Sequence, residues 1–485
     1  MSEITKIVEY KGSDFIKGLS AQGNLAVDGL FQAVDNIDPF EQMGLLLPSL
    51  TPASITPSPS VTPVSFVSWN DGAGNPYVYV QSATSLIRIN RDTPYTQSDQ
   101  TAQVTNISAS NSISWDSLYV YAGTSLRSNA FPVAIGSDVQ IAGGFNGTMN
   151  PVPLCIGLDK NLYVGQDSRV GMVSVTSHTW TSVAFSVDGN FSVRDMVNDG
   201  NYLVIFADNN KNVISTALNG DYKCKIYFWS MEPGVTLADS SYEIDGAYII
   251  GAKMLGTDIY FFTNNGLYVC NSATPPTLIR RMTETNDVSL AKPSNMKQMT
   301  VSKGSLYWMD GSNNALFNGK VYAYGAPFSG IKKLFYQPYD TSSSATYSVI
   351  EKVGSQFWLG NNTPKIFVAN TGTTRGTGRL VSLETQMEGM YQYEYTKVVL
   401  SSPLATGQSI TVSATGQYGS KTISASETKS YNATNPKQEL IFRINPSANS
   451  SKNFENIRVS VSTTGAFISR VCVYARPTND IGESL

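Results

Sequence analysis

Seven short segments rich in aromatic and β-branched residues recur along the middle of the chain at nearly even intervals. Their centres lie about 41 to 56 residues apart, close to the ~40–50 residues of one four-stranded propeller blade. Side chains of these types favour β-strands. The repeat therefore predicts an all-β protein with a propeller of six or seven blades over residues 65–383. The segments are Tyr77–Val80, Leu118–Tyr121, Leu162–Gly165, Tyr202–Phe206, Ile259–Phe262, Leu306–Trp308 and Phe357–Leu359.

Asn-Gly and Asp-Gly dipeptides lie between apolar strand segments. They tolerate the positive φ of a type I′ turn, whose twist matches that of the flanking strands. The clearest hairpin is expected at Ile259–Cys270. A pair of β-sandwiches would also show short strands and tight turns, but the even spacing favours the propeller. The dipeptides are Asp188-Gly189, Asp199-Gly200, Asn219-Gly220, Asp245-Gly246, Asn265-Gly266 and Asn318-Gly319.

Residues 1–64 differ from the repeat. They end in the proline-rich stretch Leu47–Pro63, and its five prolines exclude both a helix and a central strand. Large apolar residues between Phe15 and Leu47 do not suit a solvated tail. We therefore expect an extended N-terminal arm and linker that lies on a neighbouring subunit.

Residues 384–478 carry longer alternating strands separated by polar loops. Five strands with little helix potential predict a separate β-sandwich after the propeller. Residues 479–485 are expected to form a polar C-terminal tail. The predicted strands are Tyr395–Leu400, Ser409–Ala414, Glu439–Ile444, Ile457–Val461 and Phe467–Tyr474.

Composition limits the classes of function. Charged residues make up 15%, against roughly 25% in ordinary soluble domains, and the formal net charge is −3. Without a basic excess, a dedicated nucleic-acid binder that neutralises phosphates is excluded. No apolar stretch approaches the ~18 residues of a membrane-spanning helix, and the start has no secretory signal pattern, so we expect synthesis in a cytoplasm.

Candidate catalytic and metal-binding residues are few. His178 is the single histidine, and the sequence favours a surface strand residue there over a catalytic one. The four cysteines are dispersed, cannot form a tetrahedral zinc site with one histidine, and are expected to be small buried hydrophobic residues rather than a disulfide framework. We predict no catalytic, cofactor-binding or metal-binding residue, no cofactor, and no enzymatic activity.

Three further motifs have ordinary explanations. Ser186–Phe191 resembles the sialidase Asp-box, but Gly189 follows Asp188 directly, which favours an Asp-Gly hairpin. Asp208–Asn212 spaces oxygen ligands like a calcium loop, yet the required glycine and glutamate are replaced by Val213 and Asn219, which favours a polar turn. Gly376-Thr-Gly378 lacks the βαβ unit of a dinucleotide site.

Tryptophans within or beside the predicted strands offer two interpretations. Flat aromatic faces can stack on sugar rings, but Trp115, Trp308 and Trp358 lie where blades should pack, and packing is the favoured interpretation. Carboxylate-based glycosidases need no histidine, so a glycosidase stays a minor alternative.

The arrangement resembles structural proteins of tailed bacteriophage virions, of the propeller-bearing nozzle or hub kind. The likeness rests on the arm with Gly29–Gln32 and Phe40–Pro48, the Tyr-, Asn- and Ser-rich repeats such as Gly304–Trp308, and the C-terminal Phe467–Pro477. It extends over nearly the whole chain as layout, and no residue roles transfer with it. The resemblance implies a ring-forming subunit in a virion tail.

The expected function is therefore a non-enzymatic structural subunit of a tailed-phage virion, located in the virion after synthesis in the host cytoplasm. Expected partners are copies of itself in a ring and other tail proteins such as portal, adaptor or fibres. DNA would at most pass through a lumen, and no membrane-spanning segment is expected. The alternative is a propeller that binds host-surface glycans.

Overall fold

The computed structural model describes residues 4–11, 31–38, 42, 44–108, 110–133, 138–143, 152–209, 223–245, 249–263, 265–280, 299–302, 304–309, 321–325, 333–339, 347–361, 364–369, 371, 373–382, 384–418, 421–443 and 453–477. Within these residues the chain is all-β, with a single 3-10 turn η1 (Thr101–Gln103). No helix in this part of the chain is long and apolar enough to cross a membrane. The chain divides into two compact units, Pro52–Lys320 with Ser342–Asn370, and Met1–Thr51 with Val321–Thr341 and Thr371–Leu485.

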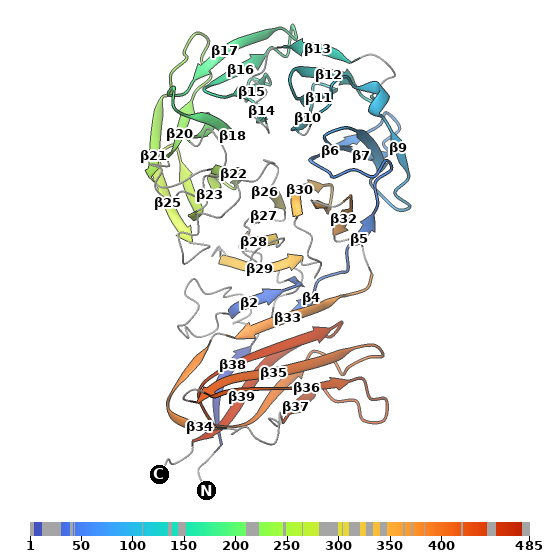
Figure 1. Cartoon of the computed structure of the whole chain (residues 1–485), viewed down its shortest axis with the longest axis vertical. Coiled ribbons are helices and arrows are strands. Elements are labelled where there is room, and N and C mark those ends of the chain that lie inside the picture. The colour runs from blue at the N-terminus through green and yellow to red at the C-terminus, as the bar shows by residue number, and fades with distance from the viewer. Residues whose placement is uncertain are drawn as a thin grey trace. The chain divides into compact units, whose positions relative to one another are not determined.

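The first unit contains six complete four-stranded antiparallel sheets, and we number the first five in chain order as blades 1 to 5 (Figure 1). Blade 1 is β6 (Ser65–Asn70), β7 (Pro76–Gln81), β8 (Leu86–Asn90) and β9 (Gln97–Asp99); blade 2 is β10 (Ser112–Trp115), β11 (Leu118–Ala122), β12 (Leu126–Ala130) and β13 (Val139–Ala142). Blade 3 is β14 (Leu154–Ile156), β15 (Leu162–Gln166), β16 (Arg169–Val173) and β17 (Trp180–Ser186). Blade 4 is β18 (Ser192–Asn198), β19 (Leu203–Asp208), β20 (Lys223–Trp229) and β21 (Ser240–Asp245); blade 5 is β22 (Ile249–Leu255), β23 (Asp258–Thr263), β24 (Gly266–Asn271) and β25 (Thr274–Arg280).

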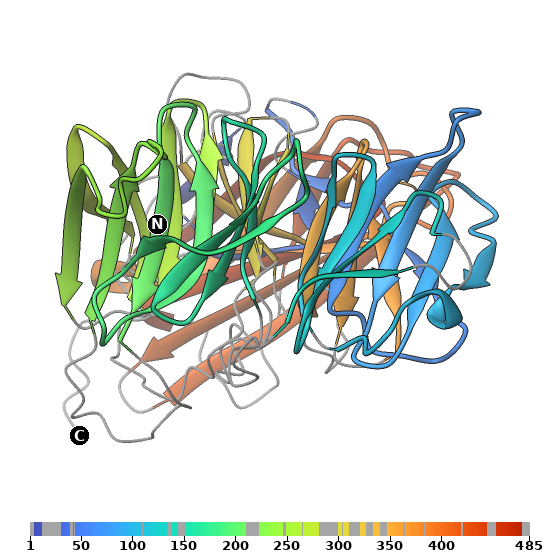
Figure 2. The same cartoon turned by 90° about the horizontal axis from the view of Figure 1, so that it is seen from above.

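Two further blades complete the ring. Blade 6 is represented in this unit by the hairpin of β26 (Met299–Ser302) and β27 (Ser305–Met309), and blade 7 by β30 (Tyr347–Val353), β31 (Gln356–Asn361), β32 (Ile366–Ala369) and β5 (Ala53–Ile55). The first strands β6, β10, β14, β18, β22, β26 and β30 contact one another in that order, and β30 contacts β6 again. Figure 2 shows strands of neighbouring blades side by side. The arrangement is a closed seven-bladed β-propeller.

The sequence repeat is confirmed by this arrangement. The seven aromatic segments are the second strands of the seven blades, β7, β11, β15, β19, β23, β27 and β31. Each second strand lies inside its sheet, and the neighbouring blades pack on its two faces, so its side chains are buried on both faces and its sequence is mostly apolar. This is why one strand per blade carries the clear pattern.

The ring is closed by a strand from the proline-rich stretch. Ile55, Ser54 and Ala53 of β5 pair with Ile366, Phe367 and Val368 of β32, so the start and the end of the first unit share one sheet. The exclusion of a central strand there was right, because β5 is the outer edge strand of blade 7. The prediction of a continuous arm and linker over 1–64 missed this strand.

The propeller core lies between the blades. Val78 and Val80 of blade 1 pack with Val349 and Trp358 of blade 7, and similar clusters join blades 2 and 3 and blades 4 and 5. Trp308 and Trp358 are fully buried, and Trp115 is 3% exposed within the cluster of blades 2 and 3. The packing interpretation of these tryptophans therefore agrees with the structure.

The second unit is a set of antiparallel strands built around β34 (Thr385–Leu400). The first half of β34 pairs with β38 (Asn453–Thr464), and its second half pairs with β39 (Ile468–Pro477) and β37 (Glu439–Phe442). On its other side β38 pairs with β35 (Ser409–Tyr418), which pairs with β36 (Lys421–Ser430), and β38 also pairs with β33 (Thr377–Ser382). These pairings are consistent with the expected β-sandwich, which stays a prediction.

Strands from before the propeller belong to this second unit. β1 (Thr5–Lys11) pairs with β39, β2 (Phe31–Asp35) pairs with β33, and β3 (Ile37–Asp38) pairs with β4 (Leu47–Pro48). Also in this unit, β28 (Val321–Gly325) pairs with β29 (Lys333–Tyr339), which forms a parallel bridge to β2. The boundaries at 64/65 and 383/384 therefore differ from those of the structure, since both ends of the chain build one unit.

Contacts along β1 explain why the predicted arm is part of its own fold. Tyr10 is buried and stacks on Phe31 with the ring centroids 4.6 Å apart. Hydrogen bonds from Lys6 and Arg470 lower the pKa of the Glu9 carboxyl to about 2. The expectation that the N-terminal arm lies on a neighbouring subunit is thus corrected for residues 5–11, whereas residues 12–30, including Phe15, lie outside the described residues.

The predicted turns fall into two groups. Asn265-Gly266 and Asp199-Gly200 form hairpin turns, with Gly266 and Gly200 at φ of 136° and 93°. Asp188-Gly189, in contrast, connects β17 to β18 and thus joins two blades, so the predicted hairpin there is wrong. Residues 219–220, 246 and 318–319 lie outside the described residues, as does the tail at 479–485.

Candidate functional site

A polar cluster lies on three consecutive inner strands of the propeller. Cys155 is on β14, Asp195 on β18 and Lys253 on β22, and each of the three is half-buried. The Asp195 carboxylate accepts hydrogen bonds from the backbone N–H groups of Ala252 and Met196, each at 2.8 Å. The carboxylate therefore links blade 4 to blade 5 at the innermost strands.

The environment of this cluster shifts its protonation. Burial raises the pKa of Asp195, while the positive charge of Lys253 and the two N–H donors act in the opposite direction. Burial also raises the pKa of the Cys155 thiol to about 12. At neutral pH Cys155 is therefore a protonated thiol, and Asp195 is the carboxyl of the cluster whose pKa is raised.

The other thiols have the same character. Burial raises the pKa values of Cys224, Cys270 and Cys472, for Cys270 to about 12. All four cysteines are free, and the three named here are buried. This agrees with their interpretation as small hydrophobic residues. In the part of the chain that the structure describes, no three His, Cys, Asp or Glu residues gather as a metal site would require.

His178 lies in a turn, not in a strand as predicted. It has a φ of 54° between β16 and β17, and its Nε2 lies 2.7 Å from Oδ2 of Asp116, a turn residue of blade 2. The two side chains are 45% and 42% exposed, so the pair is well solvated and contributes little to stability. The geometry makes it a contact between the turns of blades 2 and 3.

The first residue of the calcium-like segment, Asp208, already accepts hydrogen bonds from other residues of the protein. Asp208 is fully buried, and its carboxylate accepts hydrogen bonds from Arg194 Nε at 2.9 Å and from the N–H of Ile249 at 3.2 Å. Asn212, Val213 and Asn219 lie outside the described residues. The first expected ligand is therefore used to join blade 4 to blade 5.

The remaining motifs serve the fold. Asp188, in the connection between blades 3 and 4, accepts a hydrogen bond from Lys225 Nζ on β20 of blade 4 at 2.6 Å. Gly378 lies on β33, where an added Cβ would come within 2.4 Å of Ile37. These motifs thus lie at contacts between blades or at close approaches of the backbone to a side chain. Among the described residues, no two of them come together in one site.

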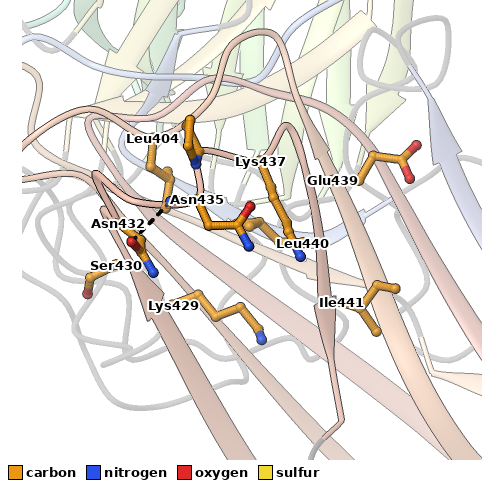
Figure 3. A pocket seen from close by; sticks show the side chains of 10 residues that line it. Leu404, Lys429, Ser430, Asn432, Asn435, Lys437, Glu439, Leu440 and Ile441 are labelled. Atoms are coloured by element: carbon orange, nitrogen blue, oxygen red, sulfur yellow. Dashed lines mark hydrogen bonds between the residues drawn. The ribbon is translucent and has the colours of Figure 1, made fainter.

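The second unit contains a pocket of about 360 Å³ at the ends of β36 and β37 (Figure 3). In Figure 3, Asn432 and Asn435 lie on one side of the pocket, and Glu439 and Ile441 on the other, with Lys429 and Lys437 extending between them. The loop is shaped by Asn432 Oδ1, which accepts hydrogen bonds from the N–H groups of Thr434 and Asn435. The lining residues are Leu404, Lys429, Ser430, Asn432, Asn435, Pro436, Lys437, Glu439, Leu440 and Ile441.

Most charges around the pocket are paired. Lys429 Nζ lies 3.1 Å from Glu427 and 5.5 Å from the centroid of the Phe442 ring, and Lys397 Nζ lies 2.7 Å from Glu439. Among the described residues Lys437 has no ion-pair partner. The pocket therefore presents one uncompensated ammonium group.

The outer strand beside this pocket is an open edge. In the described part of the second unit, β36 pairs with β35 alone, along all ten of its residues. Its side chains from Ser424 to Ser430 alternate between exposed and half-buried. The free side of β36 therefore offers backbone N–H and C=O groups for pairing with another strand.

Sequence reasoning missed both the pocket and this strand. β36 reads Lys-Thr-Ile-Ser-Ala-Ser-Glu-Thr-Lys-Ser, which shows almost no apolar alternation because both of its faces are polar. The loop Thr434–Pro436 was recognised only as polar. Two adjacent charges in an apolar strand, Arg194 and Asp195, were the available signal for the inner-strand cluster.

Comparisons with known proteins give structural matches alone. No protein-family model matches the chain, and no curated protein matches it. An inactive variant of virginiamycin B lyase from Staphylococcus aureus is 11% identical with a TM-score of 0.45, covering 66% of this chain and 98% of that chain. The WD40 propeller domain of Doa1 is 11% identical with a TM-score of 0.44, covering 67% and 97%. BamB from Moraxella catarrhalis is 9% identical with a TM-score of 0.37, covering 76% and 97%.

One comparison corrects a prediction from the sequence. The scarcity of histidine led to the expectation that the chain is not an enzyme, yet virginiamycin B lyase, which it matches, is an enzyme. At 11% identity the similarity concerns the fold, and it assigns no activity to this chain.

Proposed function

We propose that the chain is a ring-forming structural subunit of a tailed-phage virion, in the tail, where it contacts copies of itself and other tail proteins. The observation that carries the proposal is the open edge of β36 in the second unit. Proteins that act alone usually cover or shorten such an edge, or protect it with charged side chains or proline, because an open edge recruits strands from other molecules. Over its ten residues β36 carries Lys421, Glu427 and Lys429 but no proline, so no backbone N–H group is lost for pairing with the strand of a neighbour.

Two further features support an assembly role. The closed propeller is a rigid body, since each blade packs on two neighbours. The low charge content of 15% reduces the cost of burying surface against other subunits, because removing Lys and Glu side chains from water is expensive. Together these features suit a rigid subunit whose surface can be buried against other subunits at a low desolvation cost.

The test is the mass of the purified chain in solution, measured by sedimentation over a range of concentrations. Along β36, successive N–H groups alternate between the ladder to β35 and the open edge. Ala425 and Ser426 are successive residues, so one of the single variants Ala425→Pro and Ser426→Pro removes an N–H group that points to the open edge, and the other removes an N–H group that bonds to β35. The first variant should keep the thermal midpoint of the wild type but lose the assembled mass. The second should lower the thermal midpoint.

Ser426→Ala is the control, because it keeps every backbone N–H group. It should assemble like the wild type. A wild-type chain that is monomeric at all concentrations, or an outward proline that assembles normally, would contradict the proposal.

A further inference from the structure

We infer that the pocket at the ends of β36 and β37 binds a saccharide that carries a carboxylate. This inference is independent of the assembly role, since it rests on the lining of the pocket alone. The volume of about 360 Å³ lies in the ~300–1,000 Å³ range of small-molecule sites. That size suits a short sugar segment.

Charge limits the ligand to few negative groups. Lys429 is compensated by Glu427 and Lys397 by Glu439, which leaves the ammonium of Lys437. One free ammonium matches one carboxylate. A polyphosphate or a nucleic acid, with a negative charge on every unit, would meet the two glutamates as well, and the pocket offers no excess of lysine to offset that repulsion.

Neutral polar groups point to hydroxyls on the same ligand. Asn432, Asn435 and Ser430 line the pocket near Lys437 (Figure 3). A side-chain amide both donates and accepts, as a sugar hydroxyl does, so amide and hydroxyl pair in either direction. Asn432 Oδ1 already accepts two backbone N–H groups, which holds this side chain in place and leaves its NH₂ group for a ligand.

The apolar part of the lining completes the match. Leu404 and Leu440 are 7% and 9% exposed and face the pocket together with Pro436. Sugar rings carry C–H groups that lose contact with water when they pack on such a surface. A free phosphate or sulfate ion would gain nothing from it, so the lining favours a ring-bearing acid over an inorganic anion.

The experiment titrates the full-length chain with galacturonate, a sugar acid with one carboxylate, by calorimetry, and in parallel with its methyl ester. The ester keeps the ring and its hydroxyls and removes the carboxylate charge. Binding of the acid, with the ester at least about tenfold weaker, is the expected result, as for the loss of a charge-assisted hydrogen bond. Equal binding of acid and ester, or no binding of galacturonate up to the millimolar range, overturns the inference.

Variants locate the site. Lys437→Gln should weaken galacturonate binding by about tenfold, and Asn435→Asp should weaken it further by adding a like charge. Lys365→Gln, at an exposed position on the propeller, removes the same charge and should leave binding unchanged. Competition by inorganic sulfate at the same concentration as the sugar acid would show a site for any anion and would overturn the saccharide assignment.

Discussion

At the scale of single residues, buried polar side chains hold the blades in register. Asp138 is the best example. Its Oδ2 accepts hydrogen bonds from Arg127 Nε at 2.5 Å and from the Tyr121 hydroxyl at 2.6 Å, and its Oδ1 accepts one from Thr105 Oγ1 at 2.7 Å. One carboxylate thus ties two strands of blade 2 to the segment that enters the blade.

Replacing Asp138 by asparagine should destabilise the propeller by about 3 kcal/mol at neutral pH, because a buried guanidinium loses its counter-charge. Burial alone would raise the pKa of Asp138, but hydrogen bonds from Arg127, Tyr121 and Thr105 outweigh burial and hold it well below the ordinary value. A lowered folded-state pKa contributes stability above the unfolded value of about 3.9 and loses it as the pH falls. The gap between wild type and Asp138→Asn should therefore narrow below about pH 4.

Urea unfolding at several pH values measures this gap. Asp92→Asn is the matched control. Asp92 is 59% exposed and forms a solvent-exposed ion pair with Arg91 at 3.4 Å, so loss of its charge should lower the free energy of unfolding by less than about 0.5 kcal/mol. A gap of the same size at every pH would contradict the role assigned to the Asp138 charge.

At the scale of elements, one short strand closes the ring. Ile55 on β5 is 5% exposed and packs in the cluster of blades 1 and 7 with Phe66, Trp358 and Ile366. Pairing of β5 with β32 closes a loop of more than 300 residues. The packing of Ile55 and the strand pairing around it offset the entropy cost of closing that loop. We expect β5 to decide whether blade 7 stays paired.

Ile55→Ala should cost about 2–4 kcal/mol, through lost apolar burial and the cavity left behind. Hydrogen exchange at Ile366 and Val368, the partners of β5 in β32, should speed up more than exchange in β11 of blade 2. Ser54→Ala is the control, since Ser54 is exposed on the same strand. Unchanged exchange in β32 of the Ile55→Ala chain would show that β5 does not close the ring.

The elements also show how far the sequence alone can lead. The second strand of each blade was predictable because burial on both faces makes its sequence apolar. β36 was missed because both of its faces carry mainly polar side chains, so its sequence shows no apolar pattern. β5 was hidden among prolines, since an edge strand of three residues leaves no periodic pattern. Pairing between distant segments, such as β1 with β39, depends on contacts across 460 residues that no local pattern records.

The candidate sites were less predictable than the fold. Lys437, Asn432 and Asn435 form a pocket only because β36 and β37 end beside each other, and although the strand at Glu439–Ile444 was predicted, β36 was not. Asp195 and Lys253 lie 58 residues apart and meet because consecutive blades place equivalent strands side by side. Such sites follow from the ring, not from a motif.

At the scale of the whole molecule, the chain contains a closed seven-bladed propeller, and we propose that it acts in assembly. The propeller follows from the contacts of the seven first strands, and the assembly role is the proposal that the open edge of β36 supports. Rings of copies would bury that edge in every subunit, because a heterologous contact that closes on itself leaves no free partner.

Electron microscopy of the purified full-length chain can show whether its copies form rings. We expect closed rings of several copies, each copy with a seven-bladed density and a strand of a neighbour lying along residues 421–430. Particles that contain a single propeller each, at concentrations where sedimentation has reached its plateau, would contradict it.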